Sequence, residues 1–426
     1  SPGLGVNMKE QKNLKANVAS NSMSKNVEEE NLPENDHRVI GQKLDLFSVH
    51  EDTGAGLPLF HPNGAVLFRL IEQHITEKLL KSGYQIARTP HIYKAGVWKK
   101  SGHEAKYKEN MFYTESAGEK FAIKPMNCPG HIYIYKHKSH SYRELPIRIA
   151  EFGTVYRDEL SGVLTGLTRV RTITQDDAHI FCKEDQIESE VISMINFFID
   201  TYSEFGLSPD TIELSTMPKK HLGDLKSWKS AEKALEGALK KNKNKYVVNA
   251  GDGAFYGPKI DFHVKDVLGR SWQLGTIQLD FNLPERFKLF YIDDKNKKKQ
   301  VIMLHRAMLG AVERFMAILI ENCQGVFPAW LAPVQVRIIN MNDSLIEYAE
   351  GIENRLRGAG FRVDSDYRLE SVGKKVREAE MQKIPFIIVI GDKEKAAGTL
   401  AVRARGQKPK FGVKFGDFVK DLNKQV

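Results

Sequence analysis

A chain of 426 residues with 41% hydrophobic side chains is long enough to form the cores of two or three domains. Its 63 lysines and arginines against 54 acidic residues give a net charge of +9, which favours a polyanionic partner without naming one. Three widely spaced cysteines exclude a disulfide framework, and no apolar run approaches the length of about eighteen residues that a membrane span needs. Because the start also lacks a signal-peptide core, we expect a soluble, cytoplasmic protein.

The first forty residues are polar and almost free of aromatic side chains. Such a segment buries too little apolar surface to offset the conformational entropy lost on ordering. The acidic run Glu28–Glu30 and the lack of arginine before Arg38 argue against a mitochondrial transit peptide. We therefore predict a disordered leader over residues 1–40, unable to form a further domain.

Residues 41–331 mix helices and strands. Apolar residues recur at helical spacing through Asn63–Ser82, and Gly83 follows, which predicts an amphipathic helix. The next segment, YQIARTPHI, predicts a strand that ends at Pro90. The later predicted elements are a Lys-rich peripheral helix within 217–245, strands at 246–262, 271–281 and 287–292, and a helix at 307–321. Strands in series with few intervening helices favour an antiparallel sheet, so the predicted fold class is α+β.

Residues 152–181 combine two clusters of arginine and acidic residues, a glycine-containing loop and an Asp-Asp-Ala-His run. Arg157 and Glu159 alternate, so on a strand both point to one face, and Leu160–Leu167 predicts a turn into a return strand. Two further arginines share one face of that return strand. Because guanidinium groups match phosphate oxygens bidentately, the hairpin is a candidate nucleotide triphosphate site. A solvated charged hairpin is the alternative.

One cysteine and two histidines are candidate metal ligands, although none has local zinc-motif spacing to another ligand. Cys128 lies in the tight turn of Lys124–His131 (KPMNCPGH), His179 ends the Asp-Asp-Ala-His run, and His305 begins HRAMLGAVERF. A lone cysteine is more often a small buried hydrophobe, and most lone histidines are structural. Together the three would suit zinc with an open coordination position, but sequence distance alone does not bring them together.

The glycine-rich run GDGAFYGPK, residues 251–259, does not form a Walker loop, because no Gly-Lys-Ser/Thr follows. Near Phe327–Pro333 two prolines mark a domain boundary. Beyond it, strands and helices alternate through residues 332–426, which predicts a small α/β domain on a largely parallel sheet. The end of this domain is basic, and both nucleic-acid contact and a solvated face are consistent with that charge.

Several of these segments resemble class II aminoacyl-tRNA synthetases. YQIARTPHI looks like motif 1 of that class, FGTVYRDE with RVRTITQDDAHIF looks like motif 2, and LGAVERF looks like motif 3. KPMNCPGH, QDDAH and LHRAMLGAVERF together resemble the threonyl-tRNA synthetase family, and the likeness runs from about residue 39 to 426. A prolyl-type synthetase would share the general motifs and the turn at Ser101–His103, but it would have no reason to combine Cys128, His179 and His305.

The resemblance implies a threonine–tRNA ligase with a class II catalytic domain at 41–331 and an anticodon-binding domain at 332–426. Its partners would be tRNA(Thr), L-threonine and ATP with Mg²⁺. The assembly would be a homodimer formed through the motif 1 helix and strand. The alternatives are a synthetase-like RNA-binding regulator without catalysis and a prolyl-type class II synthetase.

The resemblance also assigns roles to individual residues. One zinc ion per subunit, which selects threonine over valine, would be held by Cys128, His179 and His305. The residues expected to bind ATP are Arg157, Glu159, Arg169, Gln273 and Arg314. Those expected to bind threonine are Met126, Asp177, Tyr256, Lys259 and Gln278. Catalysis is assigned to Arg157, Arg314 and His103, and anticodon reading to Arg377, Glu394 and Arg403, which as exposed charges are equally consistent with simple solvation.

Two features depart from the family's pattern. Family members commonly carry an aromatic residue where Ile173 stands, so we expect apolar contact with adenine and weaker ATP binding. Family members also use an N-terminal region to remove seryl-tRNA, because serine lacks only one methyl group, worth about 10- to 200-fold in discrimination. Residues 1–40 are not expected to fold into such a region, so we expect this chain to make seryl-tRNA without hydrolysing it.

Overall fold

The computed structural model describes residues 32–426, so most of the leader expected at residues 1–40 lies outside the described part. Its last residues are folded: Asp36 caps helix α2 (His37–Lys43) by accepting a hydrogen bond from the Arg38 N–H at 2.9 Å. His37 and Ile40 are buried. The boundary expected at residue 40 therefore falls inside α2. The average composition of forty residues does not reveal a short helix at their end, which is why the sequence prediction missed the start of α2.

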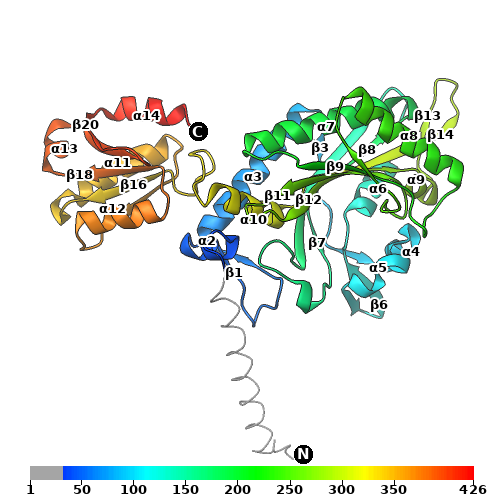
Figure 1. Ribbon diagram of the computed structural model, residues 1–426, viewed down its shortest axis with the longest axis horizontal. Coiled ribbons are helices and arrows are strands. Elements are labelled where there is room, and N and C mark those ends of the chain that lie inside the picture. Colours follow the sequence, from blue (N-terminus) through cyan, green and yellow to red (C-terminus); the bar gives the residue numbers. More distant parts are fainter. Residues whose placement is uncertain (1–31) are drawn as a thin grey trace, which may run out of the picture.

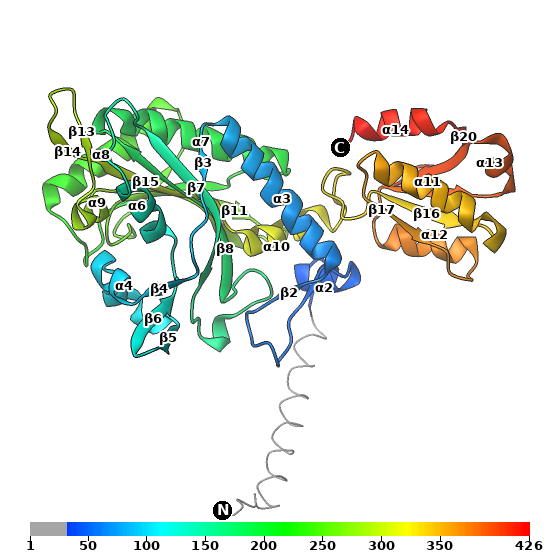
Figure 2. The same ribbon diagram turned by 180° about the vertical axis from the view of Figure 1, so that it is seen from behind.

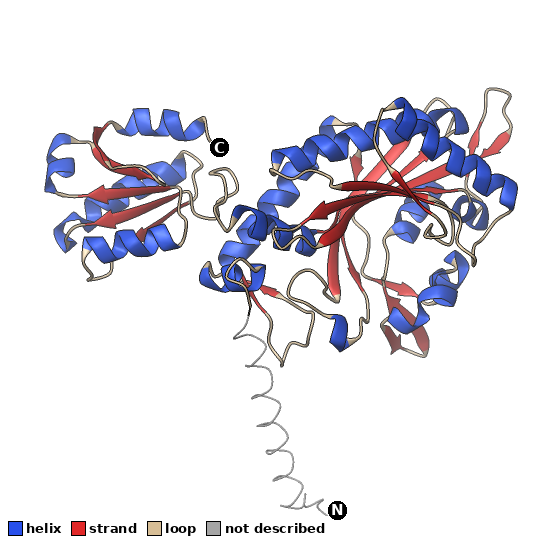
Figure 3. Cartoon of the chain, viewed as in Figure 1, coloured by secondary structure: helices blue, strands red, loops and turns tan. Residues whose placement is uncertain are grey.

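An eight-stranded sheet forms the centre of the larger unit (Figures 1 and 3), in the order β10-β9-β11-β12-β15-β8-β7-β3. The edge pairs β10-β9 and β7-β3 are parallel, and all the pairs between them are antiparallel. The prediction of an α+β fold with an antiparallel sheet is therefore confirmed. The strands are β3 (Gln85–Ile86), β7 (Ile147–Tyr156), β8 (Thr172–Cys182), β9 (Thr211–Ser215), β10 (Val247–Asn249), β11 (Lys259–Lys265), β12 (Ser271–Asp280) and β15 (Ile302–Ala311).

The four longest helices of this unit share one hydrophobic core with the sheet, and Ile40 of α2 packs into the same core. These helices are α3 (Pro62–Lys81), α7 (Ile187–Glu204), α8 (Leu225–Lys241) and α10 (Val312–Cys323). Figure 2 shows α3 crossing the sheet in the view from behind. Its buried residues recur every three or four positions, at Gly64, Leu67, Ile71, Ile75 and Leu79, as predicted for Asn63–Ser82. Gly83 follows the helix with φ +78°, a value that suits glycine.

Four predicted elements differ from the structure. The strand expected to end at Pro90 is only β3, Gln85–Ile86. The helix predicted from Ala307 begins five residues later, because β15 extends to Ala311 between β12 and β8. A short apolar run fits a central strand as well as a helix, and here pairing on both sides decides for the strand. The strand predicted at 246–262 is two strands, β10 and β11, separated by the glycine-rich loop. The strand predicted at 287–292 is only β13 (Phe290–Ile292), because helix α9 precedes it.

Smaller elements surround the main sheet. After β3 the chain has no regular structure up to Pro90. The next strands along the chain, β4, β5 and β6, form a separate three-stranded sheet in the order β4-β6-β5. The elements of this unit not yet given are β1 (Phe47–Ser48), β2 (Leu59–Phe60), β4 (Ile92–Lys94), α4 (Gly96–Ser101), α5 (His103–Tyr107), η1 (Lys108–Asn110), β5 (Tyr113–Ser116), β6 (Glu119–Ile123), α6 (Cys128–Lys136), η2 (Ser161–Val163), η3 (Glu184–Gln186), α9 (Asn282–Phe287) and β14 (Lys298–Gln300).

A smaller C-terminal unit has its own sheet and hydrophobic core (Figure 1). Its sheet order is β17-β16-β18-β19-β20, with the first two pairs parallel and the last two antiparallel, so only half of the expected parallel pairing is present. The elements are β16 (Val336–Asn340), η4 (Asp343–Leu345), α11 (Ile346–Gly358), β17 (Val363–Asp366), α12 (Val372–Met381), β18 (Phe386–Ile390), α13 (Asp392–Ala397), β19 (Leu400–Ala404), β20 (Lys410–Val413) and α14 (Phe415–Asn423). Within residues 32–426 no helix has both the length and the apolar character of a membrane span.

Candidate active site

The loop between β7 and β8 carries the first group of predicted site residues. The two strands pair in continuous antiparallel register as far as Tyr156 and Thr172, and the Arg157 N–H then donates to the Arg171 carbonyl at 2.9 Å. Within the loop, the guanidinium of Arg169 donates to Glu159 Oε2 at 2.9 Å. The predicted hairpin is therefore present, and its charged side chains contact one another as well as solvent.

Arg314 on α10 faces this loop. Its Nε donates to the Thr168 carbonyl at 2.9 Å, and its Nη1 donates to the Gln273 carbonyl at 3.0 Å. Burial lowers the pKa of Arg314, and the nearby positive charges of Arg169 and Arg157 lower it further. Three guanidinium groups gathered in one place favour a bound anion, because a phosphate would relieve their mutual repulsion.

Four other predicted residues form one row across the main sheet. His179 on β8 is the cross-strand neighbour of His305 on β15, His305 is the neighbour of Gln278 on β12, and Gln278 is the neighbour of Lys259 on β11. Directly opposite residues in antiparallel strands present their side chains on the same face. Register therefore gathers residues that are up to 126 positions apart in the sequence, from His179 to His305.

Cys128, at the start of α6, completes a group with the two histidines. One donor atom from each of Cys128, His179 and His305 lies within 4.8 Å of the other two, and all three residues are buried. Burial raises the pKa of the Cys128 thiol, and the charges of Asp177 and Asp280 raise it further. A bound cation would offset both effects and favour the thiolate. One cysteine and two histidines are residues that zinc prefers as ligands, and their donor atoms are close enough to share one ion, so the group fits zinc in both chemistry and spacing.

Residues behind this group hold its side chains in place. His131 Nδ1 lies 2.7 Å from His179 Nδ1, and Asp280 Oδ2 lies 2.8 Å from His305 Nε2. Sequence reasoning did not assign His131 a role, although it stands three residues after Cys128 and so shares that face of α6. Asp280 gave no comparable local signal, because only the sheet brings it to His305.

The residues expected around threonine lie beside the Cys and His group. The Tyr256 hydroxyl donates to Gln278 Oε1 at 2.5 Å, and its ring centroid is 5.1 Å from that of His305. Asp177 is buried and accepts a hydrogen bond from Asn127 Nδ2 at 3.1 Å. Burial raises the pKa of the Asp177 carboxyl, against the lowering effect of nearby histidines.

Three more predicted residues occupy the edges of this region. Met126 packs on the hydrophobic cluster that contains Cys128. Lys259 Nζ lies 2.8 Å from Asp261 Oδ2, and the side-chain amide of Gln273 donates to the other oxygen of the same carboxylate at 2.7 Å. Asp261 therefore connects a residue predicted for threonine with one predicted for ATP.

His103 is fully buried beside the Cys and His group. Its Nε2 lies 3.8 Å from Cys128 Sγ, and its Nδ1 lies 2.7 Å from Ser101 Oγ. Burial lowers the pKa of His103 to about 3, with smaller effects from the charges of His305 and Arg157. The structure therefore brings His103 into the same site as the predicted metal ligands.

Ile173 is the cross-strand neighbour of Val155 and packs with Val155, Val170 and Ala311 in a small apolar cluster. Only 9% of its surface is exposed. The position that is commonly aromatic in the family is thus part of a local core next to the start of α10.

The three residues predicted for anticodon reading lie on separate elements of the smaller unit. Arg377 is exposed on α12, and Arg403 on β19 contacts Glu380 of the same helix through Nη1 at 3.2 Å. Glu394 accepts from the Gly391 N–H at 3.1 Å and so caps its own helix, α13. The contacts bring Arg403 to α12 but do not join Glu394 to either arginine.

Two family models match the chain. The tRNA synthetase class II core domain (G, H, P, S and T) matches residues 111–323, and the anticodon binding domain matches residues 335–425. A core of this kind over half of the chain, with the arginine cluster and the Cys and His group inside it, defines a class II aminoacyl-tRNA synthetase fold.

Individual relatives show which family of class II synthetases the chain belongs to. The threonine–tRNA ligase of Carboxydothermus hydrogenoformans is 49% identical over 402 residues, covering 93% of this chain and 62% of the relative. The one from Clostridium acetobutylicum is 48% identical, with coverage of 93% and 62%. A crystal structure of the RNA binding domain of threonyl-tRNA synthetase from Cryptosporidium parvum Iowa II matches with TM-score 0.88 and 40% identity, covering 92% of this chain and 98% of that one. The chain belongs to the threonyl-tRNA synthetase family, and it spans about 62% of the length of the curated relatives it matches.

Proposed function

We propose that this chain is a threonine–tRNA ligase with a catalytic domain that runs from α2, which spans the boundary first expected at residue 41, to residue 331, and an anticodon-binding domain at 332–426. In the first step a carboxylate oxygen of threonine attacks the α-phosphorus of ATP, and pyrophosphate leaves as threonyl-adenylate forms. In the second step a ribose hydroxyl at the 3′ end of tRNA(Thr) attacks the threonyl carbonyl, and AMP leaves. The observation that supports this function best is the Cys128, His179 and His305 group in the same fold as three gathered arginines.

ATP would be bound by the arginine cluster. Charge develops on the phosphate oxygens during attack, and guanidinium groups together with Mg²⁺ stabilise it without transferring a proton. Arg157 would contact the α-phosphate, Arg169 the γ-phosphate and Arg314 the adenine face. Glu159 and Gln273 would complete the nucleotide contacts, with Glu159 accepting from the adenine amino group.

Threonine would be bound beside the Cys and His group, and zinc, when bound there, would supply open coordination positions for the amino and hydroxyl groups of the substrate. Asp177 would accept the hydrogen bond of the threonine hydroxyl. Valine offers no hydroxyl, and a site built for a polar group rejects an analogue lacking it by roughly 10⁴- to 10⁵-fold. The remaining contacts are proposed for Met126, Tyr256, Lys259 and Gln278.

The proposed partners are tRNA(Thr) and a second copy of the chain. Arg377, Glu394 and Arg403 are proposed to read the anticodon, and His103 to take part in the transfer step. A homodimer is supported by exposed apolar side chains at the segment like motif 1: Ile86 and Ile92 lie in or next to it, and Tyr133 and Ile134 line a surface hollow together with Arg88, Thr89 and Pro90.

Threonine-dependent exchange of labelled pyrophosphate into ATP tests this function. Zinc-loaded protein is expected to catalyse exchange with threonine, at a far lower rate with valine, and not with proline. Absence of exchange in folded, zinc-loaded protein would refute the proposal and favour an RNA-binding role without catalysis. Exchange with proline alone would instead indicate a prolyl-type synthetase.

A further inference from the structure

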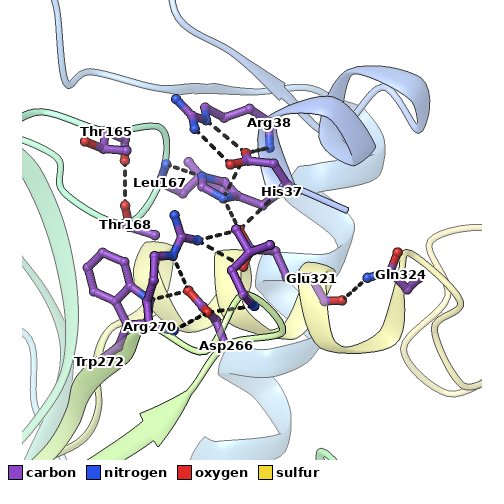
Figure 4. A network of polar contacts seen from close by, with 12 residues as sticks. His37, Arg38, Thr165, Leu167, Thr168, Asp266, Arg270, Trp272, Glu321 and Gln324 are labelled. Carbon is purple, nitrogen blue, oxygen red and sulfur yellow. Dashed lines mark hydrogen bonds and ion pairs between the residues drawn. The ribbon is translucent and has the colours of Figure 1, made fainter. Parts of the chain in front are cut away.

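A second buried polar cluster lies where α2 meets the C-terminal part of α10 and the β7–β8 loop (Figure 4). It contains Asp36, His37 and Glu321, whose donor atoms lie within 4.8 Å of one another. Protein groups already occupy those atoms: Arg38 donates to both oxygens of Asp36 at 2.9 and 2.8 Å, and Arg270 lies 3.3 Å from both oxygens of Glu321. The cluster therefore has a full set of protein partners, and what distinguishes it is the loop that it contacts.

His37 connects that loop to α10. Its Nε2 accepts a hydrogen bond from the Leu167 N–H at 3.1 Å. A backbone N–H can only donate, so Nε2 carries the lone pair and the ring proton lies on Nδ1. Nδ1 lies 2.7 Å from Glu321 Oε1 and donates to it. The fully buried ring is thus held in one tautomer, with its acceptor directed at the loop and its donor at the helix.

The contacted residue lies in a tight turn, Thr165–Arg169, whose two ends form reciprocal backbone hydrogen bonds of 3.1 Å. Arg314 holds the next residue of this turn through the Thr168 carbonyl at 2.9 Å. Arg314 and Glu321 are seven residues apart, about two turns along α10. One helix therefore holds two successive residues of the turn, Thr168 directly and Leu167 through His37.

Gly166 shows how closely the ring approaches the turn. A Cβ atom at this position would lie 2.2 Å from His37 Nε2, well inside van der Waals contact, and its φ of +44° also suits glycine. Only a residue without a side chain leaves room for the imidazole to reach the next N–H. The sequence Gly166-Leu167 is therefore matched to His37, 130 residues away from Leu167.

We propose that His37 is a positioning residue for ATP binding. By holding the Leu167 N–H, it fixes the turn Thr165–Arg169 and so the start of the Arg169 side chain, which the proposed function assigns to the terminal phosphate. The inference rests on that proposed function for the identity of the ligand. His37 contacts the turn and the helix, and it acts on ATP only through them.

Two substitutions at one position separate the two contacts of the ring. In the full chain, His37→Asn keeps a donor near the place of Nδ1 for Glu321 and removes the acceptor for Leu167, whereas His37→Gln restores an acceptor near the place of Nε2. For each variant the measurements are amide hydrogen exchange of residues 165–169 in the free protein, and KM for ATP and for threonine in pyrophosphate exchange. His37→Asn is expected to raise both the exchange rate of the turn and KM for ATP about tenfold, the size expected for one lost buried hydrogen bond. KM for threonine should stay unchanged, and His37→Gln should return both values towards wild type.

The inference is overturned if His37→Asn leaves the exchange of the turn and KM for ATP at wild-type values. It is also overturned if the two variants raise both KM values equally and lower the melting temperature equally, which is what a purely structural role predicts. Should His37→Asn not fold, Gly166→Ala perturbs the same contact from the loop, and it is expected to raise KM for ATP alone. Amide hydrogen exchange can be measured in a protein that has no catalytic activity. If the wild-type protein shows no pyrophosphate exchange, the proposed function is refuted, but the amide hydrogen exchange of residues 165–169 still reports whether His37 holds the turn.

Discussion

His179 Nδ1 lies 2.7 Å from His131 Nδ1, and His131 Nε2 faces Glu151 Oε1 at 3.3 Å. Of two ring nitrogens at such a distance, one must donate and the other accept. If His179 donates to His131, the proton on His131 Nε2 faces the Glu151 carboxylate and His179 Nε2 keeps a lone pair for a metal. Burial would raise the pKa of the Glu151 carboxyl, but His131, Thr89 and the charge of Lys124 hold it below the usual value, so Glu151 is suited to accept.

The first prediction concerns this chain of contacts. Replacing His131 with Leu removes the acceptor that orients His179, so zinc affinity should fall about 10- to 100-fold, as is typical for a lost partner of a metal ligand. Competition with a chromophoric zinc chelator measures the affinity. His140→Leu is the matched control, because His140 is also buried but bonds to the Tyr135 carbonyl outside the donor group. Equal affinities in wild type and His131→Leu would contradict the prediction.

A second prediction concerns Cys128. Cys128→Ser should lose bound zinc and threonine-dependent pyrophosphate exchange together, because a neutral hydroxyl is a poor zinc ligand. ATP binding, measured by calorimetry, should persist because the arginine cluster is a separate group. Cys182→Ser serves as control, since Cys182 is equally buried on β8 but outside the donor group, and its zinc content should stay at one per chain. A zinc-loaded, threonine-activating Cys128→Ser protein would remove the metal assignment.

A third prediction follows from Glu313 on α10. Both oxygens of this buried carboxyl lie within 3.1 Å of the Thr174 N, and burial raises its pKa from 4.5 to about 7. The folded state therefore binds the proton more tightly than the unfolded state, so this group stabilises the fold below pH 4.5 and loses that contribution as the pH rises through 7. The loss amounts to about 3 kcal/mol, at about 1.4 kcal/mol per pKa unit.

Glu313→Gln keeps an acceptor for Thr174 and removes the titration. Relative to this variant, the free energy of unfolding of the wild type should fall between pH 4.5 and 7.5, as measured by urea denaturation followed by circular dichroism. Parallel pH profiles for the two proteins would show that Glu313 has an ordinary pKa. A wild-type profile that rises relative to the variant would reverse the sign of the shift.

The fourth prediction concerns assembly. Ile134 is 42% exposed on α6, beside Tyr133 at 41%, on the apolar surface proposed to join two copies. Ile134→Lys places a charge in that surface and should convert a dimer into a monomer in analytical ultracentrifugation. Phe411→Lys is the control, because Phe411 is 73% exposed in the smaller unit, and its assembly should be unchanged. A monomeric wild type would contradict the proposed dimer. A dimeric Ile134→Lys variant would show that the interface lies on another surface.

Sequence reasoning succeeded where signals were local. The β7–β8 hairpin was predictable because its arginines, acidic residues and turn follow one another within thirty residues, and α3 was predictable from its spacing of apolar residues. The pairing of His179 with His305 was not predictable from spacing, since it depends on which strands become neighbours. The likeness to a known family supplied that proximity in advance of the structure.

The misses also have physical causes. His37 lies at the end of a segment whose average composition indicates disorder, and its burial depends on Glu321 and Leu167, both distant in the sequence. The residues from Ala307 to Ala311 have an apolar pattern that fits either a strand or a helix, and pairing with β12 and β8 decides between them. Local patterns cannot contain such long-range contacts.

His179 and His305 belong both to the candidate metal group and to the row that also contains Gln278 and Lys259. Metal binding at this group therefore reports whether the strands have paired in the correct register. Moving any one of these strands along its neighbour by a single residue would turn its member of the row to the opposite face. β8 and β15 are separated in the chain by all of the sequence from Lys183 to Val301, so the two histidines meet only after the distant halves of the sheet have paired. Zinc binding during refolding would thus report the formation of the β8–β15 pairing, and it would do so without any measurement of catalysis.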